Sequence, residues 1–138
     1  MPRKDAIHDA VKKALIKDGW NVTDDPLFLE YSDEDMYVDL GAERLLAAGR
    51  GSEKIAVEIK SFLGPSALTE RHTALGQYQV YLAVLEKVEP DRKLYIALSK
   101  SAYDELAEME TFALVIARFQ VLLVIVRIAE EEIEDWKN

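Results

Sequence analysis

The stretch SEKIAVEIKSF, residues 52–62, limits the possible fold of this chain more than any other segment. Its apolar and β-branched residues alternate with other side chains, which is the pattern of a β-strand. Successive side chains of a strand point to opposite faces, so Glu58 and Lys60 leave the same face together. Two opposite charges at this spacing indicate either a functional site or an outward-facing, salt-bridged surface. The two faces would carry Ile55, Val57 and Ile59 on one side and Ala56, Glu58 and Lys60 on the other.

The first half of the chain predicts one helix followed by three strands. Apolar residues recur at helical spacing from Ile7 to Leu15, which indicates a helix over residues 4–19. Alternation and turn residues between positions 20 and 62 predict a three-strand meander whose last two strands form a hairpin. In the middle strand, one face would carry Tyr37, Asp39, Gly41 and Glu43, and the other Val38 and Leu40.

The second half predicts helices alternating with strands. A long helix is expected over residues 67–88, and a short helix would begin at a Ser101 cap. The buried stripe of the long helix would consist of Leu75, Tyr78, Leu82 and Leu85. The other expected elements are a strand over 92–99, a helix over 111–119, a final strand over 120–128 and an acidic tail ordered in part by Trp136. Together they predict an α/β fold of the mixed-sheet (α+β) type.

The composition indicates one globular domain over residues 1–138. The chain has 138 residues, of which 49% are hydrophobic and 31% charged. This is enough to bury a full core, but the length leaves no room for a second domain. The absence of Cys excludes disulfides and thiolate metal sites. No apolar run reaches the length of a membrane span, and the start MPRKDAIHD lacks the apolar stretch of a signal peptide. We therefore expect a cytoplasmic protein.

The charge of the chain limits how it can meet nucleic acid. The formal net charge is −9, so the average field around the protein repels DNA. A role on DNA would need a local basic patch or a bound cation. The acidity does not exclude an enzyme whose metal ion bridges carboxylates to phosphate.

Asp39 and Glu58 are the candidate metal ligands. Carboxylates from adjacent strands can bind a hard divalent ion, Mg²⁺ or Mn²⁺, together with water and a substrate phosphate. Lys60, two residues beyond Glu58, would orient or deprotonate the attacking water and offset charge on the phosphate. These three residues would be the catalytic centre of a phosphodiesterase.

The order of these motifs resembles the PD-(D/E)XK nuclease superfamily. YVDLG places Asp39 in the second strand, and VEIKSF brings Glu58 19 positions later. The following helix carries QYQVY, similar to the Gln-x-x-x-Tyr element of the RecB-like branch, in which Gln77 and Tyr81 would assist catalysis. His8 stands where that branch often has a metal-binding His. The resemblance implies a restriction-endonuclease-like core of helix, three-strand meander, helix and strand, with a helix and a strand added at the C-terminus.

A closer resemblance is to the XisH family, the fdxN element excision-controlling factors of cyanobacteria. It covers nearly the whole chain, through KDAIHDAVKKALIKDGW, DMYVDLGAERL, KIAVEIKSFLGPS, ALGQYQVYLAVL and EPDRKLYIAL. It implies a part in DNA rearrangement by site-specific recombination, with a recombinase and a companion factor, XisI, as partners. The sequence departs from the nuclease motif at Val38, where the motif has Pro.

Each candidate residue also has a purely structural explanation. His8 can be a capping or hydrogen-bonded helix residue, and Asp9 a solvated one. Gln77 and Tyr81 are four residues apart, which also fits the flank of a buried helix stripe. The remaining candidates are Glu43, as a third ligand or a solvated charge, and Lys4, Arg71 and His72, as DNA phosphate contacts or ordinary surface charges.

Three classes of function follow from the sequence. The first is a metal-dependent nuclease, and the second is a nuclease-fold accessory protein that binds a partner and holds DNA ends without cutting. The third is a structural dimerisation module in which Glu58 and Lys60 form a surface pair. The apolar final strand also predicts a homo-oligomer, most simply a two-fold dimer, because its surface needs a cover.

Overall fold

The computed structural model describes residues 4–46, 51–62 and 67–138. The elements within these ranges are α1 (Lys4–Lys17), β1 (Asn21–Asp24), β2 (Leu27–Tyr31), β3 (Glu34–Val38), β4 (Leu40–Leu45), β5 (Ser52–Ile59), α2 (Ala67–Val88), β6 (Arg92–Ser99), α3 (Lys100–Ala107), α4 (Glu110–Phe119), β7 (Leu122–Arg127) and β8 (Glu132–Lys137). Six strands form one sheet in the order β1-β4-β5-β6-β7-β8, and β2 and β3 form a separate hairpin. The β5, β6 and β7 strands run parallel and the other pairs antiparallel. The predicted mixed α/β fold is confirmed.

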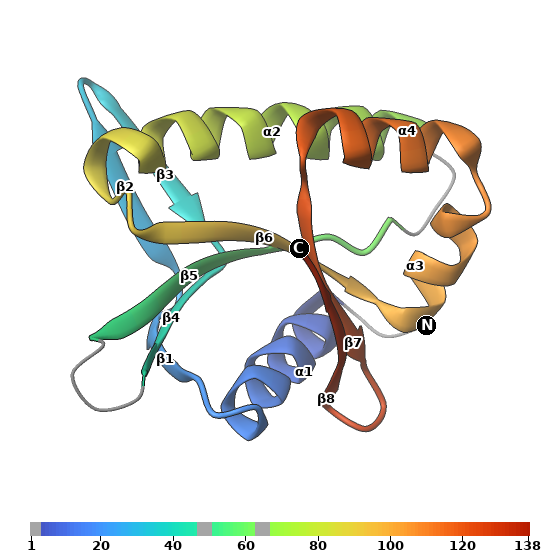
Figure 1. The fold of residues 1–138 in the computed structure, drawn as a ribbon, viewed down its shortest axis with the longest axis horizontal. Coiled ribbons are helices and arrows are strands. Elements are labelled where there is room, and N and C mark those ends of the chain that lie inside the picture. The colour runs from blue at the N-terminus through green and yellow to red at the C-terminus, as the bar shows by residue number, and fades with distance from the viewer. Residues whose placement is uncertain (1–3, 47–50, 63–66) are drawn as a thin grey trace.

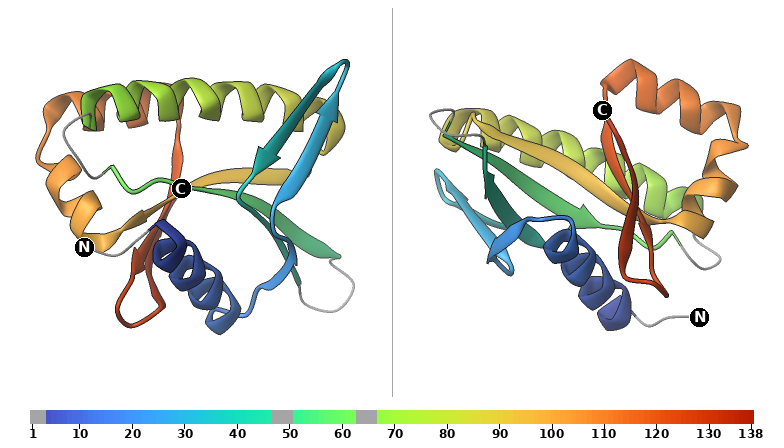
Figure 2. Two further views of the ribbon diagram at one scale, coloured as in Figure 1. Left: turned by 180° about the vertical axis from the view of Figure 1, so that it is seen from behind. Right: turned by 60° about the horizontal axis from the view of Figure 1, so that its bottom comes forward.

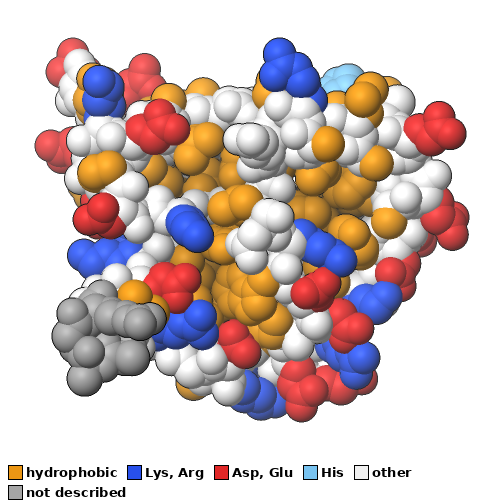
Figure 3. Space-filling view, viewed as in Figure 1, with side chains coloured by type: hydrophobic (Ala, Val, Ile, Leu, Met, Phe, Trp, Pro, Cys, Tyr) orange, Lys and Arg blue, Asp and Glu red, His pale blue; other side chains and the backbone are white. Residues whose placement is uncertain are grey.

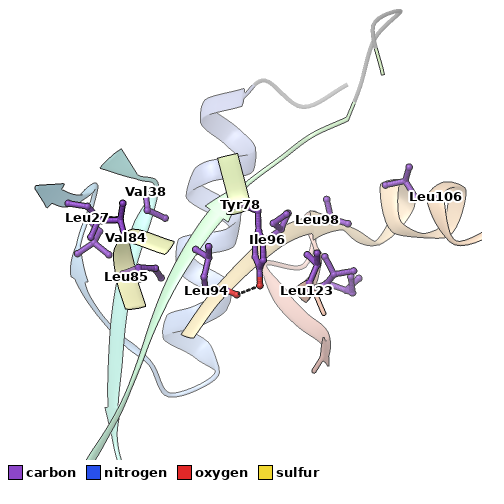
Figure 4. Close-up of a cluster of buried hydrophobic side chains, with 14 residues drawn as sticks. Leu27, Val38, Tyr78, Val84, Leu85, Leu94, Ile96, Leu98, Leu106 and Leu123 are labelled. Carbon is purple, nitrogen blue, oxygen red and sulfur yellow. Dashed lines mark hydrogen bonds between the residues drawn. The ribbon is translucent and has the colours of Figure 1, made fainter. Parts of the chain in front are cut away.

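The sheet is covered on both faces by helices. Figure 1 shows α1 below the sheet and α2 and α4 above it. Two clusters of buried side chains result, one between the sheet and α1, and one between the sheet, α2, α3 and the β2–β3 hairpin (Figure 4). None of the described helices is long and apolar enough to cross a membrane.

The alternation predicted for β5 is confirmed. Ile55 and Val57 pack in the cluster on the α1 side, and Ala56 packs in the cluster on the α2 side. A central parallel strand is buried on both faces, so it contains few residues that are not apolar. Glu58, only 8% exposed, is therefore a buried charge and not half of a surface pair.

The predicted three-strand meander is wrong in its first part. The segment folds into five strands, because the chain bends at Asp25 and Pro26, which separates β1 from β2, and again at Asp39, which separates β3 from β4. Val38 consequently packs on the α2 side of the sheet and Leu40 on the α1 side, whereas an unbroken strand would place them together. The β2–β3 hairpin projects from the sheet beside the end of α2 (Figure 2). The β4–β5 hairpin is antiparallel, as predicted.

The C-terminal tail is an edge strand of the main sheet. It forms β8, which pairs with β7 and carries Trp136 against the rings of Trp20 and Tyr95, at centroid distances of 5.8 and 4.9 Å. The apolar β7 strand therefore lies inside the sheet, between β6 and β8. Its hydrophobicity reflects burial and gives no reason to expect a dimer.

The helix boundaries follow the sequence pattern closely, except at α3. The bounds of α2 and β6 are those predicted, but the cap of α3 is Ser99 and not Ser101. The Ser99 hydroxyl accepts a hydrogen bond from the Ala102 N–H at 3.1 Å. The helix begins directly at the end of β6, so the last residue of the strand is also the cap.

We predict that Ser99→Ala lowers the free energy of unfolding by about 1 kcal/mol, because it removes the only side-chain oxygen that satisfies this N–H in the described structure. Ser101→Ala should change it by less than about 0.5 kcal/mol, since Ser101 is exposed. Urea unfolding of the two variants and the wild type measures both effects. Equal losses would contradict the assignment of the cap.

Candidate functional site

Asp39 and Glu58 lie side by side where β4 and β5 meet, each held by the backbone of the other strand. The Asp39 N–H donates to Glu58 Oε1 at 3.2 Å, and the Ile59 N–H donates to Asp39 Oδ2 at 2.8 Å. The register explains the meeting, because Leu40 is paired with Val57 and the next residues along are Asp39 and Glu58. The bend at Asp39 turns its backbone N–H and its carboxylate toward β5. Both carboxylates are therefore fixed before any ligand arrives.

Lys60 and Gln77 complete the group. The Lys60 ammonium lies 3.4 Å from Glu58 Oε2 and donates to Gln77 Oε1 at 2.5 Å. Gln77 is on α2, which covers this face of the sheet, so the helix holds the lysine in place. An ammonium has three N–H donors, and these two contacts leave one for another acceptor.

Burial and neighbouring charges shift the pKa values of Glu58 and Tyr81. Burial raises the pKa of Glu58 to about 7, and the negative charge of Asp39 also raises it, while Lys60 lowers it. Tyr81 lies on α2 beside the same carboxylates: burial raises the pKa of its hydroxyl, and the charges of Glu58 and Asp39 raise it further. Tyr81 thus keeps its proton and can act as a hydrogen-bond donor here.

A cleft of about 370 Å³ opens between this pair of strands and α1. His8 lines it together with Asp39 and Ile59. The His8 Nε2 is 2.8 Å from Asp25 Oδ1, and Lys12 Nζ is 2.8 Å from Asp25 Oδ2. The hydrogen-bonded interpretation of His8 is thus correct, and the same residue also faces the cleft.

Three acidic residues near the site, Asp5, Asp9 and Asp25, were not assigned to it from the sequence. Asp5 and Asp9 line the cleft beside His8, and Asp9 is exposed to solvent, as predicted. Their spacing from His8, at positions 5, 8 and 9, places all three on one helix face and could have revealed them. Asp25 has no such signal, because only the fold brings it to His8.

Other candidates lie away from the site. Arg71 and His72 line a different cavity, near α4, and Arg71 donates to the Met109 sulfur at 2.9 Å. Glu43 is four residues along β4 from Asp39 and opposite Lys54. The side chain of Lys4, the first residue of α1, lies outside the described residues. These positions add no ligand to the carboxylate pair.

The donor set of Asp39 and Glu58 fits a hard divalent cation. Mg²⁺ is commonly bound through one or two carboxylates and otherwise by water and phosphate, and Mn²⁺ accepts the same oxygen ligands. Within the described ranges no group of three or more His, Asp or Glu converges closely enough to form a closed protein cage. The pair therefore suits an ion that keeps open positions for water and substrate.

Comparisons with known families and solved structures find the same family over nearly the whole chain. A family model described as "XisH protein" matches residues 1–134. The crystal structure of an fdxN element excision controlling factor protein from Anabaena variabilis is 41% identical, with a TM-score of 0.88, over 98% of this chain and 100% of that one. An XisH family protein from Nostoc punctiforme is 40% identical, with a TM-score of 0.87, over 97% and 100%. Among curated proteins no match was found.

We predict that stability falls as pH rises through the titration of Glu58. Its carboxyl titrates near 4.5 in the unfolded chain and with a pKa of about 7 in the folded protein. Between these values the folded protein holds a proton that the unfolded chain has lost, so the free energy of unfolding decreases with pH. Glu58→Gln remains neutral and should lack this decrease, which is worth on the order of 1–3 kcal/mol by pH 8.

Urea unfolding at pH 5, 6, 7 and 8 in EDTA measures this difference. Glu105→Gln, at an exposed position on α3, serves as the control and should follow the wild type at every pH. Parallel pH curves for Glu58→Gln and the wild type would show that Glu58 is not a strained, buried acid.

Proposed function

Because the chain belongs to the XisH family, we propose that it is an excision-controlling factor for a DNA element and carries a metal-dependent site for a DNA phosphodiester bond. Asp39 and Glu58 hold the metal ion in this proposal, and Lys60 is the catalytic base or orienting group. The observation that carries it is the pair of carboxylates, each fixed by a backbone N–H of the neighbouring strand.

The side chains of the site position the metal ion, the water and the phosphodiester, and their charges stabilise the reaction. A bound Mg²⁺ or Mn²⁺ would polarise the phosphodiester and lower the pKa of its bound water. Lys60, steadied by Glu58 and Gln77, offers its remaining N–H to a phosphate oxygen or to the attacking water. The protonated Tyr81 hydroxyl, near enough to both carboxylates for their charges to raise its pKa, would be a second donor to the substrate. Fixed groups of this kind need no rearrangement during the reaction.

His8 is the third element of the proposal. It faces the cleft that contains Asp39, and its hydrogen bond to Asp25 fixes which ring nitrogen remains free. A carboxylate behind an imidazole is a common support for a metal-binding or proton-transferring histidine. We assign His8 an assisting role at the α1 side of the site.

The order of elements supports a nuclease of the PD-(D/E)XK type. A helix precedes an antiparallel hairpin that brings Asp39 and Glu58 together, and a helix and a parallel strand follow. Gln77 and Tyr81 occupy one flank of that helix beside the carboxylates, as the RecB-like resemblance implies. The resemblance to a nuclease thus agrees with the side chains as well as with the sequence of elements.

A second candidate function is an accessory factor that holds DNA ends or partner proteins without cutting. The negative charge of the protein favours it: the formal net charge is −9, and Asp5 and Asp9 line the cleft. This negative charge repels DNA unless a bound cation or a basic partner protein compensates for it. The XisI-like companion factor and the recombinase implied by the family resemblance are the partners we propose to supply that surface.

We predict that any DNA cleavage by this protein requires Mg²⁺ or Mn²⁺ and falls at least about 100-fold in Glu58→Ala and in Lys60→Ala. The first change removes a metal ligand, and the second removes the group that positions the nucleophile. Lys54→Ala is the matched control, since Lys54 lies on the same strand away from the site and should retain activity.

The assay offers duplex, branched and single-stranded DNA at low salt, with and without the companion factor. Low salt is needed because salt weakens the attraction between DNA phosphates and the cationic groups of the site, Lys60 and the bound metal ion. Cleavage that persists in both variants would place the chemistry elsewhere. Absence of cleavage under all of these conditions, with metal binding intact, would favour the accessory function.

A further inference from the structure

Helix α4 is apolar and yet contains no buried residue. Its sequence ETFALVIARF has seven apolar residues of ten, and none is buried in the folded chain. Leu114, at its middle, is 70% exposed. An apolar helix at the surface normally indicates a covered face. Among the residues that the structure describes, part of this helix therefore has no partner.

The inner face of α4 is already used. Phe112 and Ile116 are partly buried and pack against the cluster beneath α2. A cavity of about 230 Å³ between α2 and α4 is lined by the same two residues and by Leu68 of α2. Figure 3 shows hydrophobic side chains gathered across this face of the molecule, below the two helices. The uncovered part of α4 must then be its outer side.

The outer face of α4 has a regular arrangement of charge around Leu114. At about 100° per residue, Glu110 and Arg118 fall about 40° to either side of Leu114. Thr111 and Ala117 lie at the borders of this face, where Thr111 also lines the cavity toward α2, and all five residues are exposed. Neither Glu110 nor Arg118 forms an ion pair with any other residue that the structure describes. The helix thus presents one large apolar residue between two opposite charges that have no ion-pair partner in the described structure, with the Arg118 guanidinium 5.5 Å from the centre of the Phe119 ring.

This arrangement is complementary to itself when the helix direction is reversed. Four residues separate Leu114 from Glu110 on one side and from Arg118 on the other. Two antiparallel copies centred on Leu114 bring each Glu110 beside the Arg118 of the other copy, and Leu114 against its equivalent. Parallel copies would place like charges together. A two-fold axis requires a surface of this self-complementary kind.

We propose that α4 is a homodimer contact, in which the outer faces of two antiparallel α4 helices pack around a two-fold axis at Leu114. The occupant is a second copy of this chain, because the charge pattern matches its own reverse. The small side chains of Thr111 and Ala117 permit close approach of the helices. Ten residues give only about 15 Å of contact, so the dimer is weak and concentration-dependent.

Charge variants of α4 provide the sharpest test. Glu110→Arg makes both charges on the face positive, and Arg118→Glu makes both negative, so each variant alone should dimerise about tenfold more weakly or worse. Mixed in equal amounts, the two should form a heterodimer at least as readily as the wild type. Leu114→Glu should abolish association, and Leu45→Glu, at another exposed position, should leave it unchanged.

Sedimentation equilibrium from about 5 μM to 1 mM at low salt gives the dissociation constants. Circular dichroism of each variant checks that α4 remains folded. A wild-type chain that stays monomeric to 1 mM would overturn the proposal and leave the face to a different protein. So would dimers that persist in Leu114→Glu, or a mixture of the charge variants that associates no better than either alone.

Discussion

The structure depends most on two hydrogen bonds between Asp39 and the end of β5, in each of which a backbone N–H donates to a side-chain carboxylate. The N–H of Asp39 donates to Glu58, and the N–H of Ile59 donates to Asp39. These bonds stabilise the bend that separates β3 from β4, which sends the β2–β3 hairpin toward α2 and leaves β4 in the sheet. The same bonds bring two carboxylates together in a largely buried place. Architecture and site therefore have one local cause.

Such a pair is unfavourable for the folded chain when both acids are charged. Burial and mutual repulsion raise the pKa of Glu58 to about 7, and the single adjacent ammonium of Lys60 offsets only part of this effect. Sites that store electrostatic strain of this kind are often functional, since a cation or substrate relieves it. The helix α2 contributes Gln77 and Tyr81 to the same group, so the core that covers the sheet also completes the site.

The sequence predicted those parts that periodicity alone determines. The alternation of β5 and the bounds of α2 and β6 follow from burial of regular elements, and the convergence of Asp39, Glu58 and Lys60 follows from the hairpin register. The bend at Asp39 could not be predicted, because it depends on a hydrogen bond from β5. The Ser99 cap, the Asp25 contact with His8 and the pairing of β8 likewise arise from tertiary contacts that no local pattern contains.

The most direct test of the carboxylate pair as a metal site is anomalous diffraction from crystals soaked in millimolar MnCl₂, for the wild type and for Asp39→Asn. We expect a Mn²⁺ peak in the wild type at about 2.1–2.2 Å from a carboxylate oxygen of Asp39 and one of Glu58, and its loss in the variant. A wild-type crystal with ordered Asp39 and Glu58 side chains but no peak between them would contradict the account. So would a peak of equal height in Asp39→Asn.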